Sequence, residues 1–429
     1  MIVNKTIQKK MIVWAKRCLE TVGRITVFMV VVSIVCACTT LTPTPSPTPN
    51  ATLTTMATTT ATQTTTPITI PQAIGGLGQF LRYAPFDVVD WGELRFENRL
   101  GQLEALGQEH IRSLEDWRVA ASKKQFEELL AFDTMPEGMR HYTTFWLENT
   151  GLDYFAVDYA LKLLGDGPLE LTILEGGYDK GTIGPKLEEL GYEETAAWFY
   201  SAFGDYEPNI QDPLGKVSLG RMNRIAFHGN FIITSGATDP VQKVLAAMES
   251  QASSLAGVPG YLALAEALGD PHSATFLAYE RFLDKYPDPN IVPHGMAEGW
   301  DDLHQWELAG FGFTRKDVEA GTFSIALYYP DPEAATADSV ELTQRLDSYR
   351  LISTSGGRYP WEIDTPRLAE VISRYCPIKE VEIDNGTWGS TLTLTCDVVA
   401  KGSDVRWWYY MIGSLYDLGF LLPNPEGGK

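Results

Sequence analysis

The sequence predicts an α+β fold, with a helical N-terminal section followed by mostly antiparallel sheets that are covered by helices. Two observations lead to this prediction. Before residue 165, apolar residues recur at spacings of three and four, which is the period of a one-sided helix. After residue 165, short alternating runs bounded by Gly, Asn and Pro predict strands, and helices separate them. Two ferredoxin-like halves are one arrangement that would fit this order.

The helical section is predicted from residues 100–132, LGQLEALGQEHIRSLEDWRVAASKKQFEELLAF, which place their apolar side chains on one side of a helix. A further segment opens at Pro136 and closes at residues 149–151. Asp153 then resembles the cap of another helix over residues 154–164, which Gly165 ends. We therefore expect helices up to residue 165.

Strands and helices alternate in the next part of the chain. RIAFHGNFIITS is typical of a tight hairpin, because Gly229 and Asn230 tolerate the positive φ that two-residue turns require. Asp239 and Pro240 are typical of a helix start. The elements expected here are strands at residues 169–173 and 197–202, a helix at 183–190, the hairpin at 224–235, helices at 239–248 and 261–268, and a strand at 273–279.

The last third repeats this pattern, although no exact internal repeat is visible in the sequence. The elements expected here are strands at residues 308–314 and 322–329, a helix at 335–349, a strand pair at 380–383 and 391–399, and a closing helix at 404–418. The folded part therefore divides into an α+β domain at residues 73–305 and a second α+β half or subdomain at 306–429.

The net charge of -21 is unevenly distributed over the 429 residues. Residues 1–37 hold six cations and one acid, which leaves 28 cations and 54 acids for the remainder, a net charge of -26. Binding to nucleic acid relies on clustered Lys and Arg that neutralise phosphates. The composition therefore argues against nucleic acid as a partner.

Residues 1–37 have the features of a secretory signal peptide. A cationic segment ending at Arg24 precedes the uncharged apolar run ITVFMVVVSIVCA, residues 25–37, which ends in small residues. This run is 13 residues long, whereas a membrane-spanning helix needs about 20. A cleaved signal is therefore favoured over an uncleaved membrane anchor, and Met11 is an alternative start of translation.

Residues 38–72 are predicted to form a disordered stalk. Residues 39–70 contain 16 Thr and five Pro among 32 residues and carry no charge. Such a segment buries too little apolar surface to offset its chain entropy. Fully extended at ~3.1 Å per residue it would reach about 100 Å, and as a flexible chain about 30 Å. Stalks of this composition are also typical of O-glycosylation.

Residues Val35, Cys36, Ala37 and Cys38 resemble the lipobox of bacterial lipoproteins. The resemblance implies that the chain is cut before Cys38 and that this cysteine carries a lipid anchor, with palmitate among its acyl chains. Val35 stands where Leu is commonest, and ordinary cleavage at the same place is the alternative. The resemblance implies attachment to the cell membrane on its extracytoplasmic side.

The folded part is similar to a group of uncharacterised bacterial extracytoplasmic lipoproteins. The similarity rests on NTGLDYFAVDYAL, LTILEGGYDKGTIGPKLEELGY, SLAGVPGYLALAEALG and SLYDLGFL, which lie within residues 149–421. These are short turn and cap signals, so they bear on the fold. The group implies no activity, no catalytic residues and no cofactor for this chain.

Two cysteines remain beyond the signal and anchor, Cys376 and Cys396. Exported proteins favour bonded cysteines. A hairpin that turns around Gly386 would place these two residues opposite each other, and a bridge between them would contribute about 3 kcal/mol. Two buried free thiols are the alternative. A zinc site built on cysteine is excluded, because such sites need about four ligands.

Two further clusters suggest chemistry, each with a structural alternative. Five residues could bind a divalent metal: His294, Glu298, Asp301, Asp302 and His304. Their spacing matches no known site, so a solvated loop is favoured and no metal is assigned.

The aromatic run at residues 406–410, with Trp300 and Trp306, could bind sugars. Residues 405–419 are apolar on almost every side, which favours core packing.

No local catalytic motif is present: G-x-S-x-G, the phosphate-binding G-x-x-x-x-G-K-[ST] and H-E-x-x-H are all missing from the sequence. We therefore expect a lipid-anchored extracytoplasmic protein that acts as a binding or envelope-structural component, with an envelope protein or a saccharide as its partner. The alternative is an exported hydrolase or metal-dependent enzyme whose site is assembled from distant residues.

Overall fold

A computed structural model describes residues 75–86, 91–122, 134–166, 169–250, 252–284, 303–317, 320–348, 378–399 and 421. The predicted signal peptide, the stalk and the closing helix at 404–418 lie outside the described residues.

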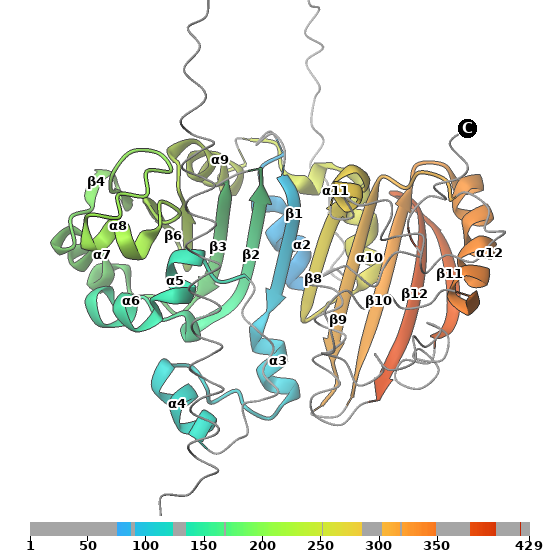
Figure 1. The fold of residues 1–429 in the computed structure, drawn as a ribbon, viewed down its shortest axis with the longest axis horizontal. Helices are drawn as coiled ribbons and strands as arrows, with labels where there is room; N and C mark the ends of the chain where they lie inside the picture. Colours follow the sequence, from blue (N-terminus) through green and yellow to red (C-terminus); the bar gives the residue numbers. More distant parts are fainter. Residues whose placement is uncertain are drawn as a thin grey trace, which may run out of the picture. The chain divides into compact units, whose positions relative to one another are not determined.

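The described strands form one twelve-stranded sheet in which all neighbours are antiparallel (Figure 1). Their order across the sheet is β11-β12-β10-β9-β8-β1-β2-β3-β7-β6-β5-β4. Helices pack on this sheet, so the predicted α+β class is confirmed. The strands are β1 (Trp91–Asn98), β2 (Val157–Gly165), β3 (Glu170–Gly176), β4 (Glu193–Ala196), β5 (Phe199–Ser201), β6 (Arg224–His228), β7 (Phe231–Ser235), β8 (Ser273–Ala278), β9 (Leu308–Arg315), β10 (Ala320–Tyr329), β11 (Ile378–Gly386) and β12 (Gly389–Val399).

Helices lie between these strands along the chain. The α-helices are α2 (Gly75–Tyr83), α3 (Arg99–Ala105), α4 (Leu114–Ser122), α5 (Glu137–His141), α6 (Thr143–Thr150), α7 (Lys180–Glu189), α8 (Pro213–Ser218), α9 (Thr238–Met248), α10 (Pro259–Leu268), α11 (Tyr279–Asp284) and α12 (Pro332–Ser348). Two 3-10 turns complete the described helices, η2 (Tyr154–Ala156) and η3 (Leu255–Gly257).

The sheet consists of two halves that repeat one topology. The first half runs from α2 to α9 and the second from α10 to β12. Counted outward from the seam where β1 pairs with β8, the strand orders are β1-β2-β3-β7-β6 and β8-β9-β10-β12-β11. In both halves a helix precedes three strands that pair in chain order, with further helices between the first and the second of them. A crossover that begins with α7 or α12 then leads to an outer hairpin, and in the first half this crossover also contains β4, β5 and α8. The first half alone continues outward, through β5 and β4.

The registers align the two halves residue by residue. Leu94 faces Phe276 across the seam, and both side chains are buried on the same face of the sheet. Both outer hairpins then have two-residue turns at equivalent positions, Gly229 with Asn230 and Thr387 with Trp388. Counting outward from the seam pair gives two equivalent rows, Leu94-Leu163-Leu171-Ser235-Arg224 and Phe276-Gly310-Ala326-Thr393-Glu382.

This topology corrects the expectation of ferredoxin-like halves. A ferredoxin-like unit is a split β-α-β arrangement, in which the two strands joined by the first helix do not pair with each other. Here helices also follow the first strand of each half, but β1 pairs directly with β2 and β8 directly with β9. The expected boundary between residues 305 and 306 falls between β8 and β9, which pair directly and both belong to the second half.

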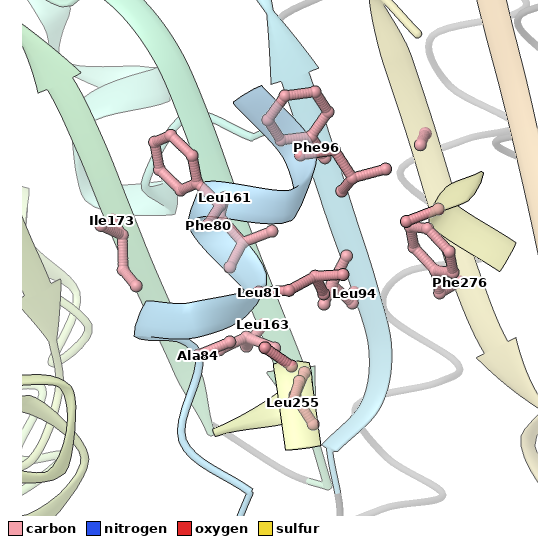
Figure 2. Close-up of a cluster of buried hydrophobic side chains, with 14 of the residues drawn as sticks. Phe80, Leu81, Ala84, Leu94, Phe96, Leu161, Leu163, Ile173, Leu255 and Phe276 are labelled. Carbon is pink, nitrogen blue, oxygen red and sulfur yellow. The ribbon is translucent and has the colours of Figure 1, made fainter. Parts of the chain in front are cut away.

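One face of the sheet is covered by α2, α9 and α10. Leu77, Phe80 and Leu81 of α2, and Ala84 directly after it, recur at helical spacing and are fully buried. Figure 2 shows Phe80, Leu81 and Ala84 directed at Leu94 and Phe96 of β1 and at Leu161 and Leu163 of β2. The ring of Phe80 lies 5.8 Å from the ring of Phe96, edge to face, a favourable aromatic geometry.

The opposite face of the first half is covered by α5 to α8. Met139 of α5, Trp146 of α6 and Ile183 and Leu187 of α7 pack there against Leu174 of β3. In the second half, α12 lies over β10, β12 and β11. The sheet is therefore the middle layer of three.

The helical prediction for residues 73–165 is wrong in two places. Residues 91–98 form β1, whose Leu94 and Phe96 face the core while Glu93, Arg95 and Glu97 face the other way. Residues 157–165 form β2, between β1 and β3. Asp153 does cap a turn, accepting from the Phe155 N–H, but this turn is the short η2. β2 is buried on both faces over much of its length and lacks clear alternation, so its pattern resembled a helix.

The single helix expected over residues 100–132 is instead two helices in its described part. α3 ends before Gly107, which has a φ of +62°, a conformation that glycine adopts without strain. α4 then begins at Leu114, and residues 123–133 lie outside the described part.

The remaining elements that were predicted inside the described ranges are confirmed. In the β6–β7 turn only Gly229 has a positive φ, +61°, at the first central position, as in a type II′ turn. α9 buries Val241 and Val244, and Leu245 and Met248 pack against the same cluster.

The β11–β12 hairpin forms with a different register from the one expected. Its turn lies at Thr387 and Trp388, so Ile378 and not Cys376 faces Cys396. Cys396 is buried on β12, and Cys376 lies outside the described residues. The bridge between Cys376 and Cys396 therefore stays a prediction.

Candidate functional site

Charged side chains occupy the centre of the sheet on the face opposite α2. Glu93, Arg95 and Glu97 of β1 point to this face because they alternate with the core residues of that strand. Lys162 of β2 faces Arg95, and Glu170 opens β3. Buried charges are costly unless they are paired, so their partners decide what this region can do.

Lys162 is the most enclosed cation in this region. Its Nζ lies 3.4 Å from Glu170 Oε1 and donates to the Met135 carbonyl at 3.0 Å. Burial lowers the pKa of Lys162, and the nearby carboxylates of Glu170 and Glu137 oppose that shift. The ion pair with Glu170 therefore offsets part of the cost of burying the ammonium.

Glu170 joins Lys162 to two further residues. Its Oε1 accepts from the Glu137 backbone N–H at 2.9 Å, and its Oε2 accepts from Arg221 Nη1 at 3.0 Å. Arg221 Nη1 also lies 3.5 Å from Glu137 Oε2. We refer to Lys162, Glu170, Glu137 and Arg221 as the central charge cluster. Its members satisfy one another, which is the arrangement of a structural network.

A second buried polar group lies where β1 ends. The Thr134 hydroxyl donates to Glu97 and lies 2.8 Å from the Tyr154 hydroxyl, which in turn donates to Glu97 at 3.3 Å. Burial raises the pKa of Tyr154 well above its usual range, with the charge of Glu97 as the next cause. Tyr154 therefore remains a protonated donor to Glu97.

Arg99 closes this group from the start of α3. Its Nη1 donates to the Tyr154 carbonyl at 2.9 Å, and its guanidinium carbon lies 4.7 Å from the centre of the Phe155 ring. Stacking of Arg on an aromatic face is favourable. These contacts tie α3 to the turn before β2, so we assign them to stability.

A different arrangement is found in the second half, around His304. Its Nδ1 lies 2.7 Å from Asp338 Oδ1 of α12, and its backbone N–H donates to the same oxygen at 3.1 Å. The second oxygen, Oδ2, accepts from the Tyr329 hydroxyl at 2.8 Å. We call His304, Asp338 and Tyr329 the His304 relay.

Exposure separates the members of the His304 relay. The His304 side chain is 54% exposed, whereas that of Asp338 is 1% exposed. Tyr329 is fully buried. Burial raises the pKa of Tyr329 far above its usual range, with the charge of Asp338 as the next cause. The relay therefore places an accessible imidazole on a buried, hydrogen-bonded carboxylate, an arrangement that orients a histidine for proton transfer or ligand binding.

The structure brings together only part of the predicted metal cluster. His304 is described, while His294, Glu298, Asp301 and Asp302 lie outside the described residues. The partner of His304 is Asp338, which lies 34 positions later in the chain. Asp338 was missed because only the apolar residues of its helix were considered. One signal was present in the sequence: Asp338 lies one helical turn before Leu342, so both residues are on the buried side of the helix.

The sites predicted near the chain ends remain untested. Cys38, Trp300 and the aromatic run at residues 406–410 lie outside the described residues. Trp306 is fully buried, with its ring 5.0 Å from Tyr279 and 5.3 Å from Phe282. For Trp306, core packing is therefore correct and a sugar platform is not.

No group of three or more His, Cys, Asp and Glu side chains in the described part of the chain could hold a metal ion. No helix there is both long and apolar enough to cross a membrane.

Comparison with known proteins found no match among protein families, curated proteins or solved structures.

Proposed function

We propose that the chain is a lipid-anchored extracytoplasmic protein whose folded part acts as a binding or envelope-structural component. The order of segments carries this proposal. A cationic and apolar export segment ends at Cys38, an uncharged Thr/Pro-rich segment follows, and the first described helix begins at Gly75. This is the order of anchor, spacer and displayed domain, and its lipoprotein character rests on the resemblance at Cys38.

The physics of anchoring supports this order. Each buried methylene adds about 0.8 kcal/mol of membrane affinity, and more than one acyl chain is needed for a stable anchor. After residue 37 the chain carries a net charge of -26, and an anionic lipid surface repels such a chain. Attachment would therefore depend on lipid at Cys38, with the stalk holding the domain away from the membrane.

The described fold supports a role in binding or envelope structure. The charges at the centre of the sheet bind one another, as Lys162 and Glu170 do, so they are not available to a ligand. Contacts with a partner would then use the outer surface of the domain. An envelope protein or a saccharide remains the proposed partner, and the acidity of the chain argues against nucleic acid.

Mass spectrometry of the mature N-terminus tests the anchor. We expect a chain that begins at an acylated Cys38, and Cys38→Ala is expected to shift the protein from the membrane fraction to the soluble fraction. Cys36→Ala is the matched control and should stay in the membrane fraction. An unmodified Cys38, or a chain that still begins at Met1, would contradict the proposal.

Sedimentation with isolated cell-envelope material tests the binding role. The Cys38→Ala protein, purified without detergent, should pellet with washed envelope fragments in a saturable manner. Digesting either the protein or the saccharide of the fragments beforehand identifies the partner class. Recovery of the protein only in the supernatant would contradict a binding role.

A second candidate function, that of an exported hydrolase, is favoured by one observation. The His304 imidazole is half-exposed and is held by a buried carboxylate 2.7 Å away, which is how enzymes orient a general base.

A further inference from the structure

The hydrogen bonds around Asp338 define which nitrogen of His304 carries a proton. The His304 backbone N–H can only donate, and it donates to Asp338 Oδ1 at 3.1 Å. Tyr329 donates to Oδ2 at 2.8 Å. With both oxygens accepting, a carboxylate is the species that suits the site. The ring therefore donates its Nδ1–H to Asp338, and its Nε2 keeps the lone pair.

The position of the ring makes this lone pair usable. The side chain of His304 is 54% exposed, so the edge of the ring away from Asp338 is open to solvent. Asp338 is held from both sides, by the segment before β9 and by the end of β10, and it belongs to the long helix α12. Because three elements hold the carboxylate, the direction of the imidazole is set before any ligand arrives.

We propose that His304 is the proton-accepting residue of an acyl-transfer site on the second half, with Asp338 and Tyr329 as its positioning residues and carboxylic esters as its substrate class. This inference rests on the hydrolase candidate and goes beyond the anchored binding role. The proposed site at His304 is distant from Cys38 in the sequence.

The reaction needs only water as a co-reactant. His304 Nε2 takes a proton from water while the water oxygen bonds to the ester carbonyl carbon, which gives a tetrahedral intermediate and an imidazolium. The imidazolium returns this proton to the leaving alkoxide as the carbon–oxygen bond to that alkoxide breaks. The products are a carboxylic acid and an alcohol, and His304 is neutral again. Asp338 stabilises the imidazolium formed between the two steps.

Hydrolysis of p-nitrophenyl esters with acyl chains of two to eight carbons, a series of about four compounds, tests the site. His304→Gln should lose the protein-dependent rate by about 10²-fold, the usual contribution of a general base. His228→Gln removes a histidine in the β6–β7 hairpin, outside the His304 relay, and should keep the full rate. If the wild type hydrolyses none of these esters faster than His304→Gln does, the proposal is overturned.

The positioning residues are tested by readouts that a purely structural role would not change. Tyr329→Phe should lower kcat a few-fold while KM is unchanged, because the substrate does not touch this residue. Asp338→Asn should lower kcat by about 10-fold or more and move the ring proton from Nδ1 to Nε2, as seen in ¹⁵N NMR spectra of labelled histidine. If Asp338→Asn does not fold, the tautomer of His304 is measured by ¹⁵N NMR in the wild type, where the proton is expected on Nδ1. A proton on Nε2 in the wild type would also overturn the proposal.

The anchored role and the acyl-transfer site can fail independently. The Cys38→Ala protein should keep the full esterase rate, and His304→Gln should stay in the membrane fraction. A loss of both properties on either substitution would contradict the separation of the two sites.

Discussion

The two halves of the sheet share a topology and a register but differ in the chemistry of the same face. Where the first half places Arg95, Lys162 and Glu170, the second half places Leu277, Ala309 and Ile325 at the equivalent positions. The reverse holds at the end of the third strand, where Tyr329 of the relay corresponds to buried Leu174. Each half therefore carries its own polar cluster where the other half is apolar.

The difference separates what the fold requires from what it permits. Both halves need apolar residues under α2 and α10, where Leu94 and Phe276 meet. On the other face, charged and apolar side chains are both accepted, provided that the charged ones find partners. Topology and site chemistry can thus vary independently in this protein.

The largest expected effect comes from breaking the central charge cluster. Glu170→Ala leaves Lys162 buried without its partner, so we expect a loss of about 3–5 kcal/mol of unfolding free energy. Urea denaturation of the wild type and of Glu170→Ala measures this loss of unfolding free energy. Lys162→Ala combined with Glu170→Ile copies the second half and should recover much of this loss. A Glu170→Ala variant within about 1 kcal/mol of the wild type would mean that the cluster is not essential.

The next largest effect is a pH dependence at the seam. His272 precedes β8, and its Nδ1 accepts from the Arg315 backbone N–H at 3.1 Å. Burial, with the charge of Arg315 as the second cause, lowers the pKa of His272 to about 4. The unfolded chain then binds the proton more readily, so stability falls as the pH drops from about 6.5 to about 4, by up to about 3 kcal/mol.

His272→Asn should flatten this dependence, because an amide oxygen can accept from Arg315 without titrating. Urea denaturation of both proteins at pH 7.0, 5.5 and 4.5 measures the difference, and His110→Asn serves as the control at an exposed site. Parallel losses of stability in the wild type and in His272→Asn would assign the acid sensitivity to other groups.

The smallest effect compares the caps of the two crossover helices. Asp179 accepts from the Gly181 N–H at 3.0 Å before α7, and Asp331 accepts from the Glu333 N–H at 2.9 Å before α12. Asp179→Ala and Asp331→Ala should each cost about 1 kcal/mol. Thermal unfolding of the two variants measures both. A loss in only one half would show that the two crossovers are not energetically equivalent.

The part of the fold that was predicted from sequence is the part set by local chemistry. The β6–β7 hairpin followed from Gly229, and α9 followed from Val241 and Val244. Strands β1 and β2 were missed because their neighbours in the sheet come from distant parts of the chain. β2 pairs with β1 across more than 50 residues, and no local pattern encodes such a pairing.

The candidate site was predictable only in part for the same reason. His304 stood out as a histidine among acids, but Asp338 and Tyr329 reach it through the packing of α12 on β10. The residue-by-residue equivalence of the two halves was also hidden in the sequence, because equivalent positions such as Lys162 and Ala309 share no chemistry. Register reveals this equivalence, and register follows from the tertiary structure.

The position of β1 has a mechanical consequence if the chain is anchored at Cys38 as proposed. β1, the first described strand, lies at the centre of the sheet, between β2 and β8, and not at an edge. Tension applied from the N-terminal side would first meet α2, whose Phe80 and Leu81 are buried. It would then load a strand that is hydrogen-bonded on both sides, so strand-by-strand unzipping from an edge would not be available as a route of forced extraction.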